Sequence, residues 1–175
     1  ALIERISTNY WSSGVPLMFN SLNGMAVPEN APNEMSLVIG PTEVADVMTG
    51  KVVTLSPHHS FNDVANLMND RYFRHCVVVD QAGVVVGVIS DRDILRTLAR
   101  NPNSRSKSLD QIMTKQPVTV KRNTAIIDAV GKMLAKRINC LPVIDDDGRV
   151  CGIVTSTDLL KSYQQLLELV QKQAR

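Results

Sequence analysis

The chain has 175 residues, which is room for one or two ordinary domains and too little for a large multi-domain enzyme. Its composition, 44% hydrophobic and 21% charged, is typical of a globular protein, and a net charge of +2 gives no reason to expect a nucleic-acid partner. The longest apolar run, 84–89, is too short to span a bilayer, the first residues do not resemble a signal peptide, and the three cysteines form no CxxC pair. We therefore expect a reduced, cytoplasmic protein without a membrane partner.

Residues 1–39 are expected to form an N-terminal arm, and the sequence does not define its role. Tyr10 and Trp11 give it some apolar content, whereas Pro16 and Pro28 favour an extended chain.

An internal repeat follows this arm. Residues 47–95 align with 112–160 without a gap, and methionines, glycines and aspartates coincide at fixed positions. Identical pairs include Met48/Met113, Gly83/Gly148, Gly87/Gly152 and Asp93/Asp158. The chain is therefore interpreted as a tandem duplication.

Each copy has the same predicted order of elements. A short β-branched strand precedes an amphipathic helix, then two apolar strands flank a turn that ends in glycine, and a second helix follows. In the first copy the strands are 52–55, 76–80 and 84–89, with helices beginning near Ser60 and at Asp91. In the second copy the strands are 118–120, 141–145 and 150–154, with helices near Ile126 and at Ser156. The predicted fold class is α+β, with the order β-α-β-β-α twice.

The same pattern predicts the domain boundaries. Residues 40–100 form the first repeat domain, the polar segment 101–108 is the linker, 109–165 form the second repeat domain, and 166–175 extend the last helix. That helix carries an apolar stripe of Leu160, Tyr163, Leu167 and Val170. The stripe predicts a homodimer, and the alternative is that it packs against the chain's own N-terminal arm.

Three features of each copy together resemble a known family. Both copies open with a stretch ending in Met-Thr (44–49 and 109–114), contain an apolar hairpin strand ending in Asp, and carry Gly-h-h-Ser/Thr-x-x-Asp, at 87–93 and 152–158, where h is apolar. The chain is therefore similar to a pair of cystathionine-β-synthase (CBS) domains, the arrangement called a Bateman module. The resemblance implies two units packed about a pseudo-twofold axis, two clefts for adenosine-type ligands, and assembly into a dimer.

The pairs Ser90/Asp93 and Thr155/Asp158 carry the strongest site hypothesis. Their spacing at a strand-to-helix junction is first of all that of a helix N-cap. The same geometry also suits a nucleotide, because unpaired N–H groups at the helix start and the hydroxyl can donate to a phosphate. The carboxylate can accept from both ribose hydroxyls. Gly87 and Gly152 are expected to let the ligand approach the backbone.

Cations and apolar walls complete the candidate set. Arg92 and Arg137 are the candidate phosphate ligands, and Val53 and Val118 would flank an adenine. The alternative is surface charge for each arginine and ordinary core for each valine. The other basic residues at the end of the first helix, Arg71, Arg74 and His75, are interpreted as surface charge.

The two clefts are not expected to be equivalent. Arg92 aligns with Thr157, so the cleft with Ser90 and Asp93 should favour the more highly phosphorylated ligand. Val77 stands where the family usually has proline and where the second copy has Pro142, which puts the shape of one cleft in doubt and predicts a more rigid wall in the other. The acidic turn 145–148 lacks the ligand spacing of a calcium loop.

Taken together, the sequence predicts a regulatory module with no catalytic and no metal-binding residues. It needs no cofactor and binds AMP, ADP, ATP or another adenosyl compound as a regulatory ligand. Two alternatives remain: an interaction module that dimerises through its helices without a ligand, and a regulatory fragment of a larger enzyme or transporter.

Overall fold

The computed structural model describes residues 40–173; the predicted N-terminal arm lies outside them. The first repeat contains α1 (Val44–Val47), β1 (Thr54–Leu55), α2 (Phe61–Arg71), β2 (His75–Val79), β3 (Val85–Ser90) and α3 (Asp91–Arg100). Two 3₁₀ turns, Ser104–Ser106 and Leu109–Gln111, lead to β4 (Thr114–Lys115). The second repeat contains β5 (Val120–Lys121), α4 (Ile126–Lys136), β6 (Cys140–Ile144), β7 (Val150–Thr155) and α5 (Ser156–Gln173). The predicted β-α-β-β-α order and the α+β class are confirmed.

Local sequence signals set the ends of these elements. Ser60 caps α2 in a capping box with Asp63, as their spacing predicts. Both hairpin turns end in a glycine with positive φ, 82° at Gly83 and 78° at Gly148, a conformation that other residues rarely adopt. The last helix, α5, is 18 residues long.

The two sheets exchange their edge segments. In the first sheet β1 pairs parallel with β2, and β2 antiparallel with β3. The fourth strand, β4, comes from the start of the second repeat and pairs with β3, with Gly87 opposite Lys115. The start of the first repeat crosses in return, because Thr49 forms an antiparallel bridge with Ile153 on β7. Each repeat therefore completes its sheet with the opening segment of the other.

A methionine from each opening segment covers a glycine of the other repeat. A Cβ placed on Gly87 would collide with the side chain of Met113, and one placed on Gly152 would lie 2.6 Å from the sulfur of Met48. The expectation that these glycines admit a ligand to the backbone is therefore wrong. Their missing side chains make room for the methionines.

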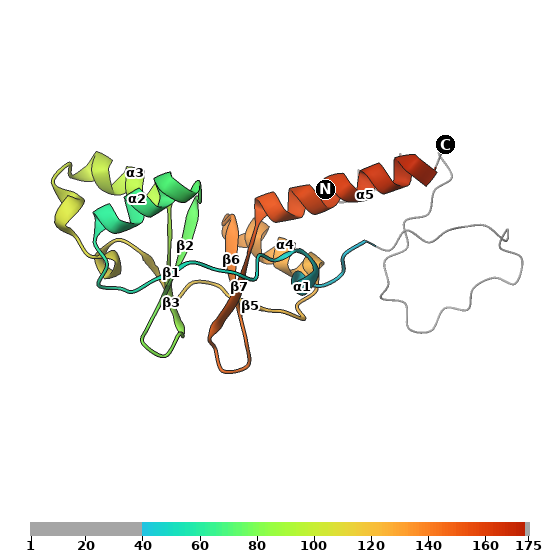
Figure 1. Ribbon diagram of the computed structural model, residues 1–175, viewed down its shortest axis with the longest axis horizontal. Helices are drawn as coiled ribbons and strands as arrows, with labels where there is room; N and C mark the ends of the chain where they lie inside the picture. Colours follow the sequence, from blue (N-terminus) through green and yellow to red (C-terminus); the bar gives the residue numbers. More distant parts are fainter. Residues whose placement is uncertain (1–39, 174–175) are drawn as a thin grey trace, which may run out of the picture.

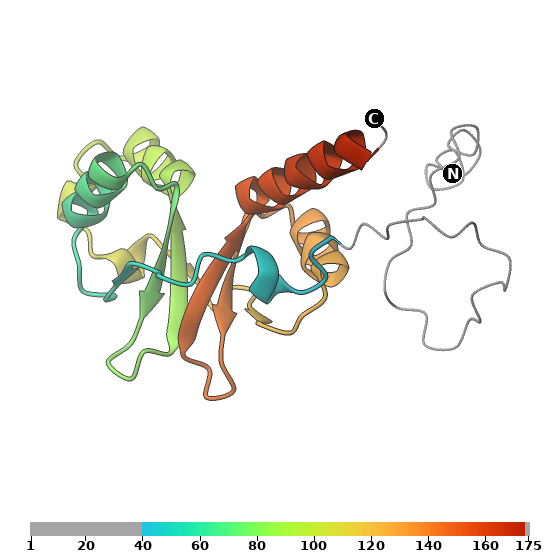
Figure 2. The same ribbon diagram turned by 45° about the vertical axis from the view of Figure 1, so that its right-hand side comes forward.

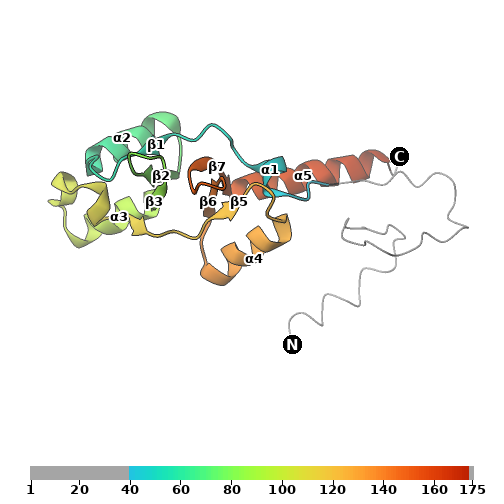
Figure 3. The ribbon, with the colours of Figure 1, turned by 90° about the horizontal axis from the view of Figure 1, so that it is seen from below.

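Two apolar cores lie beneath the two helical layers. The first includes Leu55, Val64 and Ile89, and the second includes Val44, Leu141 and Val154. The hairpins β2–β3 and β6–β7 stand side by side in the middle of the molecule, with α2 and α3 outside one and α4 outside the other (Figures 1 and 3). Their turns touch, because the Val150 N–H donates to the Gly83 carbonyl at 3.1 Å. The repeats are thus related by a pseudo-twofold axis between the hairpins, and α5 projects away from the body (Figure 2).

Candidate functional site

Two clefts open between the repeats, of about 430 and 620 Å³, sizes typical of small-molecule sites. The Thr155 cleft is lined by Thr49, Lys51, Val52, Val53, Tyr72, Phe73, Arg74, His75, Ile153, Thr155, Thr157, Asp158 and Lys161. The Ser90 cleft is lined by Arg74, His75, Val88, Ser90, Asp91, Arg92, Asp93, Leu95, Arg96, Thr114, Gln116, Pro117, Val118, Lys136, Arg137, Ile138, Asn139, Cys140 and Ser156. Each cleft joins the Ser/Thr-x-x-Asp motif of one repeat to the opening strand region of the other.

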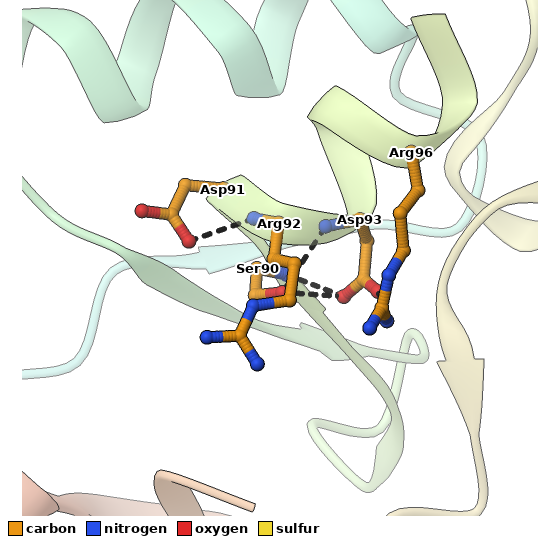
Figure 4. A network of polar contacts seen from close by, with 5 residues as sticks. All are labelled: Ser90, Asp91, Arg92, Asp93 and Arg96. Atoms are coloured by element: carbon orange, nitrogen blue, oxygen red, sulfur yellow. Dashed lines mark hydrogen bonds and ion pairs between the residues drawn. The ribbon is translucent and has the colours of Figure 1, made fainter. Parts of the chain in front are cut away.

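In the Ser90 cleft, Ser90 and Asp93 form a closed capping box at the start of α3. The Asp93 carboxylate accepts the Ser90 N–H at 2.9 Å and the Ser90 hydroxyl at 2.6 Å, both on Oδ2. The Asp93 N–H in turn donates to Ser90 Oγ at 3.2 Å. Figure 4 shows the side chains of Arg92 and Arg96 on either side of this box, with a guanidinium nitrogen of Arg96 3.7 Å from Asp93 Oδ1. The second carboxylate oxygen therefore faces Arg96 rather than the cap.

The Thr155 cleft has the same box at the start of α5. Oδ2 of Asp158 accepts the Thr155 N–H at 2.8 Å and the Thr155 hydroxyl at 2.6 Å. The Asp158 N–H donates back to Thr155 Oγ1 at 3.3 Å. Capping uses one oxygen of each aspartate and leaves Oδ1 out of the box, so the capping role and a ligand-binding role are compatible in both repeats.

The backbone at the start of α3 is less available than the sequence suggested. The Asp91 N–H donates to the Arg74 carbonyl at 3.0 Å, and the Arg92 N–H donates to Oδ1 of Asp91 at 2.7 Å. The Asp93 N–H is held by Ser90. The expectation of unpaired N–H groups for a phosphate at this helix start is therefore wrong, and a phosphate in this cleft would be bound by side chains.

Val53 and Val118 occupy equivalent positions in opposite clefts. Val53 lies in the Thr155 cleft with 41% of its surface exposed, so the alternative that it is ordinary core does not apply. Val118 lies in the Ser90 cleft and also packs against the second core. Each is therefore placed opposite the motif of the other repeat.

Positive charge is distributed unequally between the clefts. Arg92 and Arg137, the two arginines singled out from the sequence, both line the Ser90 cleft. Arg137 follows α4 in the left-handed conformation with φ 54°, and Tyr72 does the same after α2 with φ 56°. The cations of the Thr155 cleft are Lys51, Arg74 and Lys161.

Several lining residues were missed by the sequence analysis. Arg96 and Lys161 follow the two motif aspartates by one helical turn, and this repeated basic position is a signal that could have found them. Arg74, interpreted from the sequence as surface charge, donates from Nη2 to the Thr157 hydroxyl at 3.1 Å on the other repeat. No local pattern marks that contact.

The proline difference between the copies lies in the buried strands and not in the cleft linings. Val77 and Pro142 are both fully buried in their strands, and neither lines a cleft. The difference therefore belongs to the core, and the doubt about cleft shape does not attach to these side chains.

Outside the clefts, α5 presents a row of apolar side chains. Leu160 and Tyr163 are 67% and 59% exposed, and Leu167 is exposed as well. Within residues 40–173, no helix is long and apolar enough to cross a membrane, and no group of three or more His, Cys, Asp or Glu side chains could hold a metal ion.

Sequence comparison matches the CBS domain family twice, at residues 44–100 and 109–165. A homoserine O-acetyltransferase of Methanohalobium evestigatum is 34% identical over 124 residues, which are 71% of this chain and 24% of that protein. The chain spans about a quarter of the length of this and the next curated relatives.

Solved structures agree with the family match. The CBS domain pair of protein MJ0100, in complex with 5′-methylthioadenosine and S-adenosyl-L-methionine, is 31% identical with a TM-score of 0.65, over 70% of this chain and 99% of that one. CBSX2 in complex with AMP is 27% identical with a TM-score of 0.65, over 72% and 98%. The cytosolic domain of the Mg²⁺ channel MgtE, in complex with ATP, is 26% identical with a TM-score of 0.59, over 69% and 48%.

Proposed function

Because this chain belongs to the CBS domain family, with two such domains in tandem, we propose that it is a non-catalytic regulatory module that binds an adenosyl ligand between them. The observation that carries the proposal is the repeated site: two clefts, each with a Ser/Thr–Asp capping box facing the opening strand region of the other repeat. The ligands of the three similar structures, which all contain an adenosyl group, support the same ligand class.

We propose the same arrangement for the ligand in both clefts. The ribose hydroxyls donate to Oδ1 of Asp93 or Asp158, the oxygen that capping leaves free. The adenine lies against Val118 in the Ser90 cleft and against Val53 in the Thr155 cleft. The phosphates lie near the guanidinium groups, Arg92 and Arg137 in the Ser90 cleft, because arginine binds phosphate through two parallel hydrogen bonds.

The two clefts then differ in the ligand that they prefer. Four cations line only the Ser90 cleft, namely Arg92, Arg96, Lys136 and Arg137, whereas Lys51 and Lys161 are those of the Thr155 cleft alone. We propose that ADP or ATP binds preferentially in the Ser90 cleft. AMP, or an adenosyl compound without phosphate, suits the Thr155 cleft.

The exposed stripe of α5 supports a homodimer. Leu160, Tyr163 and Leu167 would form a continuous apolar surface on a helix that projects from the body, and a second copy could bury it. The three cysteines are free thiols and Cys76 and Cys140 are buried, which suits a reducing, cytoplasmic compartment.

A second candidate follows from the curated relatives. The chain spans about a quarter of their length, so the module could regulate an enzyme or transporter to which it is joined. In that case the ligand chemistry of the clefts is unchanged, and the regulated activity lies outside the repeats.

A thermal shift experiment tests the proposal. The protein is heated with AMP, ADP, ATP, NAD or S-adenosylmethionine, and a ligand at one hundred times its Kd should add about 2.7 kcal/mol to the free energy of unfolding. Guanosine nucleotides serve as the control for the adenine. If no adenosyl compound raises the Tm, the interaction module without a ligand is the correct alternative.

A further inference from the structure

Two residues line both clefts, Arg74 and His75. They follow the left-handed end of α2, where β2 begins. The Arg74 carbonyl accepts the Asp91 N–H at 3.0 Å, which fixes the main chain beside the Ser90 cleft. Its side chain leads to the other cleft, where Nη2 donates to the Thr157 hydroxyl at 3.1 Å. One residue is therefore anchored at one cleft and reaches into the other.

Of these two residues only Arg74 is a permanent cation. His75 is partly buried, and burial, the largest influence on it, lowers the pKa of its imidazole below the ordinary value of 6.5. A neutral imidazole adds no charge near pH 7. Arg74 is thus the one lasting positive charge common to the two sets of lining residues.

The second repeat has no counterpart to this side chain. Asn139 aligns with Arg74, and its carbonyl accepts the Ser156 N–H at 3.0 Å, as the Arg74 carbonyl does at Asp91. Asn139 is short and neutral and lines only the Ser90 cleft. Thr157 meanwhile takes the place of Arg92 on the helix, so the guanidinium of the Thr155 cleft is supplied by the other repeat.

We infer that Arg74 is a phosphate-binding side chain shared by the two clefts, so that a phosphorylated ligand in one cleft weakens phosphate binding in the other. The inference rests on the proposed function. A guanidinium fork donates its paired hydrogen bonds to one phosphate at a time, so the two phosphates compete for it. Because linkage between binding sites is reciprocal, the loss is the same whichever cleft fills first. Adenosine has no phosphate to bind Arg74, so its two binding events are independent.

Calorimetric titration with AMP tests this coupling. Asp158→Ala weakens the Thr155 cleft, so that the Ser90 cleft fills first and its affinity is measured nearly alone, and Asp93→Ala does the reverse. The two variants give the affinity of each cleft when the other is empty. In the wild type, the second AMP should bind about tenfold more weakly than the lower of these two affinities. Tenfold is the loss expected for one charge-assisted hydrogen bond. Arg74→Met keeps the apolar stem and should abolish this difference. Arg71→Met, the matched control at an exposed arginine that ends α2 and lines neither cleft, should retain it.

Adenosine separates the possible failures. It should bind wild type and Arg74→Met equally, which also shows that the variant is folded. If the second AMP binds as tightly as in the two aspartate variants, or more tightly, or if Arg74→Met keeps the tenfold difference, the inference is overturned while the proposed function stands. It is also overturned if only one cleft ever binds AMP. If neither adenosine nor any nucleotide binds any of these proteins, the proposed function fails and the inference with it.

Discussion

The side chain of Met48 occupies the space that a side chain at Gly152 would need. A Cβ on Gly152 would lie 2.6 Å from the Met48 sulfur and 3.3 Å from the backbone oxygen of Thr49. The methionine can shift, but the backbone is held by the hydrogen bonds between Thr49 and Ile153. The glycine is therefore part of the contact between the repeats.

We expect Gly152→Ala to lower the free energy of unfolding by about 1–3 kcal/mol, the usual penalty for overpacking. Gly131 is the matched control, because it lies within α4 and a Cβ added there would meet no atom within 4 Å. Gly131→Ala should raise stability by about 0.5–1 kcal/mol through helix propensity. Urea denaturation measures both. Equal stability of Gly152→Ala and wild type would show that the opening segment is not held as described.

Asp93→Ala and Asp158→Ala should each lower nucleotide affinity in one cleft by roughly ten- to a hundredfold, the loss of a charged hydrogen-bond acceptor. Both variants also lose a helix capping box. The control is therefore a variant that loses a capping box away from the clefts. Asp63→Ala does this, because Asp63 accepts the Ser60 N–H at 2.7 Å in an equivalent box on α2, outside both clefts. Calorimetry should show that Asp63→Ala binds nucleotide with the affinity of the wild type. Unchanged binding by the double variant would refute the ribose assignment.

Arg92→Ala should weaken ATP binding in the Ser90 cleft by about tenfold and AMP binding by less, since ATP carries more phosphate groups for the guanidinium. Arg100→Ala, at the far end of α3 and in neither cleft, is the control. The ATP-to-AMP preference is measured by titrating both nucleotides. An unaltered preference would remove Arg92 from the phosphate site.

Sedimentation should give twice the chain mass of 19.3 kDa at micromolar concentration if α5 joins two copies. Replacing Leu160 and Tyr163 with glutamate places charges in the exposed apolar row and should restore the monomer. Gln165→Glu adds a charge to the same helix at an exposed polar position and should leave the dimer intact. A wild-type monomer would instead mean that something other than a second copy covers the stripe.

Alkaline pH should reveal the two buried thiols. Burial raises the pKa of Cys76 to about 11 and that of Cys140 to about 12, from an ordinary value of 9.0. Above pH 9 the unfolded chain loses these protons while the folded chain keeps them, so the free energy of unfolding falls as pH rises. Each thiol contributes about 1.4 kcal/mol per pH unit until its folded pKa is reached.

Denaturation under reducing conditions at pH 8 and at pH 10 measures this slope. Cys76→Ala should remove its own contribution, and the difference between the two proteins cancels the titration of lysines and tyrosines. An identical pH dependence in the variant would mean that Cys76 ionises freely in the folded protein.

The repeat, the hairpins and the capping boxes could be predicted because each rests on local sequence. Gly83 and Gly148 determine the hairpin turns, and the Ser-x-x-Asp spacing determines a helix start, each within a few residues. Because the sequence is duplicated, each of these signals occurs twice. The exchange of opening segments could not be predicted this way. A two-residue strand such as β4 has no periodicity, and its partner is fixed only by the packing of the two repeats.

Which residues of the two repeats share a cleft was unpredictable for the same reason. Val53 and Asp158 lie far apart in sequence, and nothing in either repeat indicates that they line one cleft. The hydrogen bond from Arg74 to Thr157 joins the two repeats, so it depends on how they pack against each other. Arg92 and Arg137, in contrast, could be proposed from residue type, because phosphate requires cations, and both line the Ser90 cleft.

The bridge between Thr49 and Ile153 also affects how the chain folds during synthesis. The partner of Thr49 leaves the ribosome only when nearly the whole second repeat has been made, so the Met48–Thr49 segment emerges long before its docking site exists. The first sheet likewise gains its fourth strand only when β4 emerges after the linker. Contacts of such large sequence separation slow folding, so the nascent first repeat exposes an unpaired strand edge at β3 until β4 has emerged.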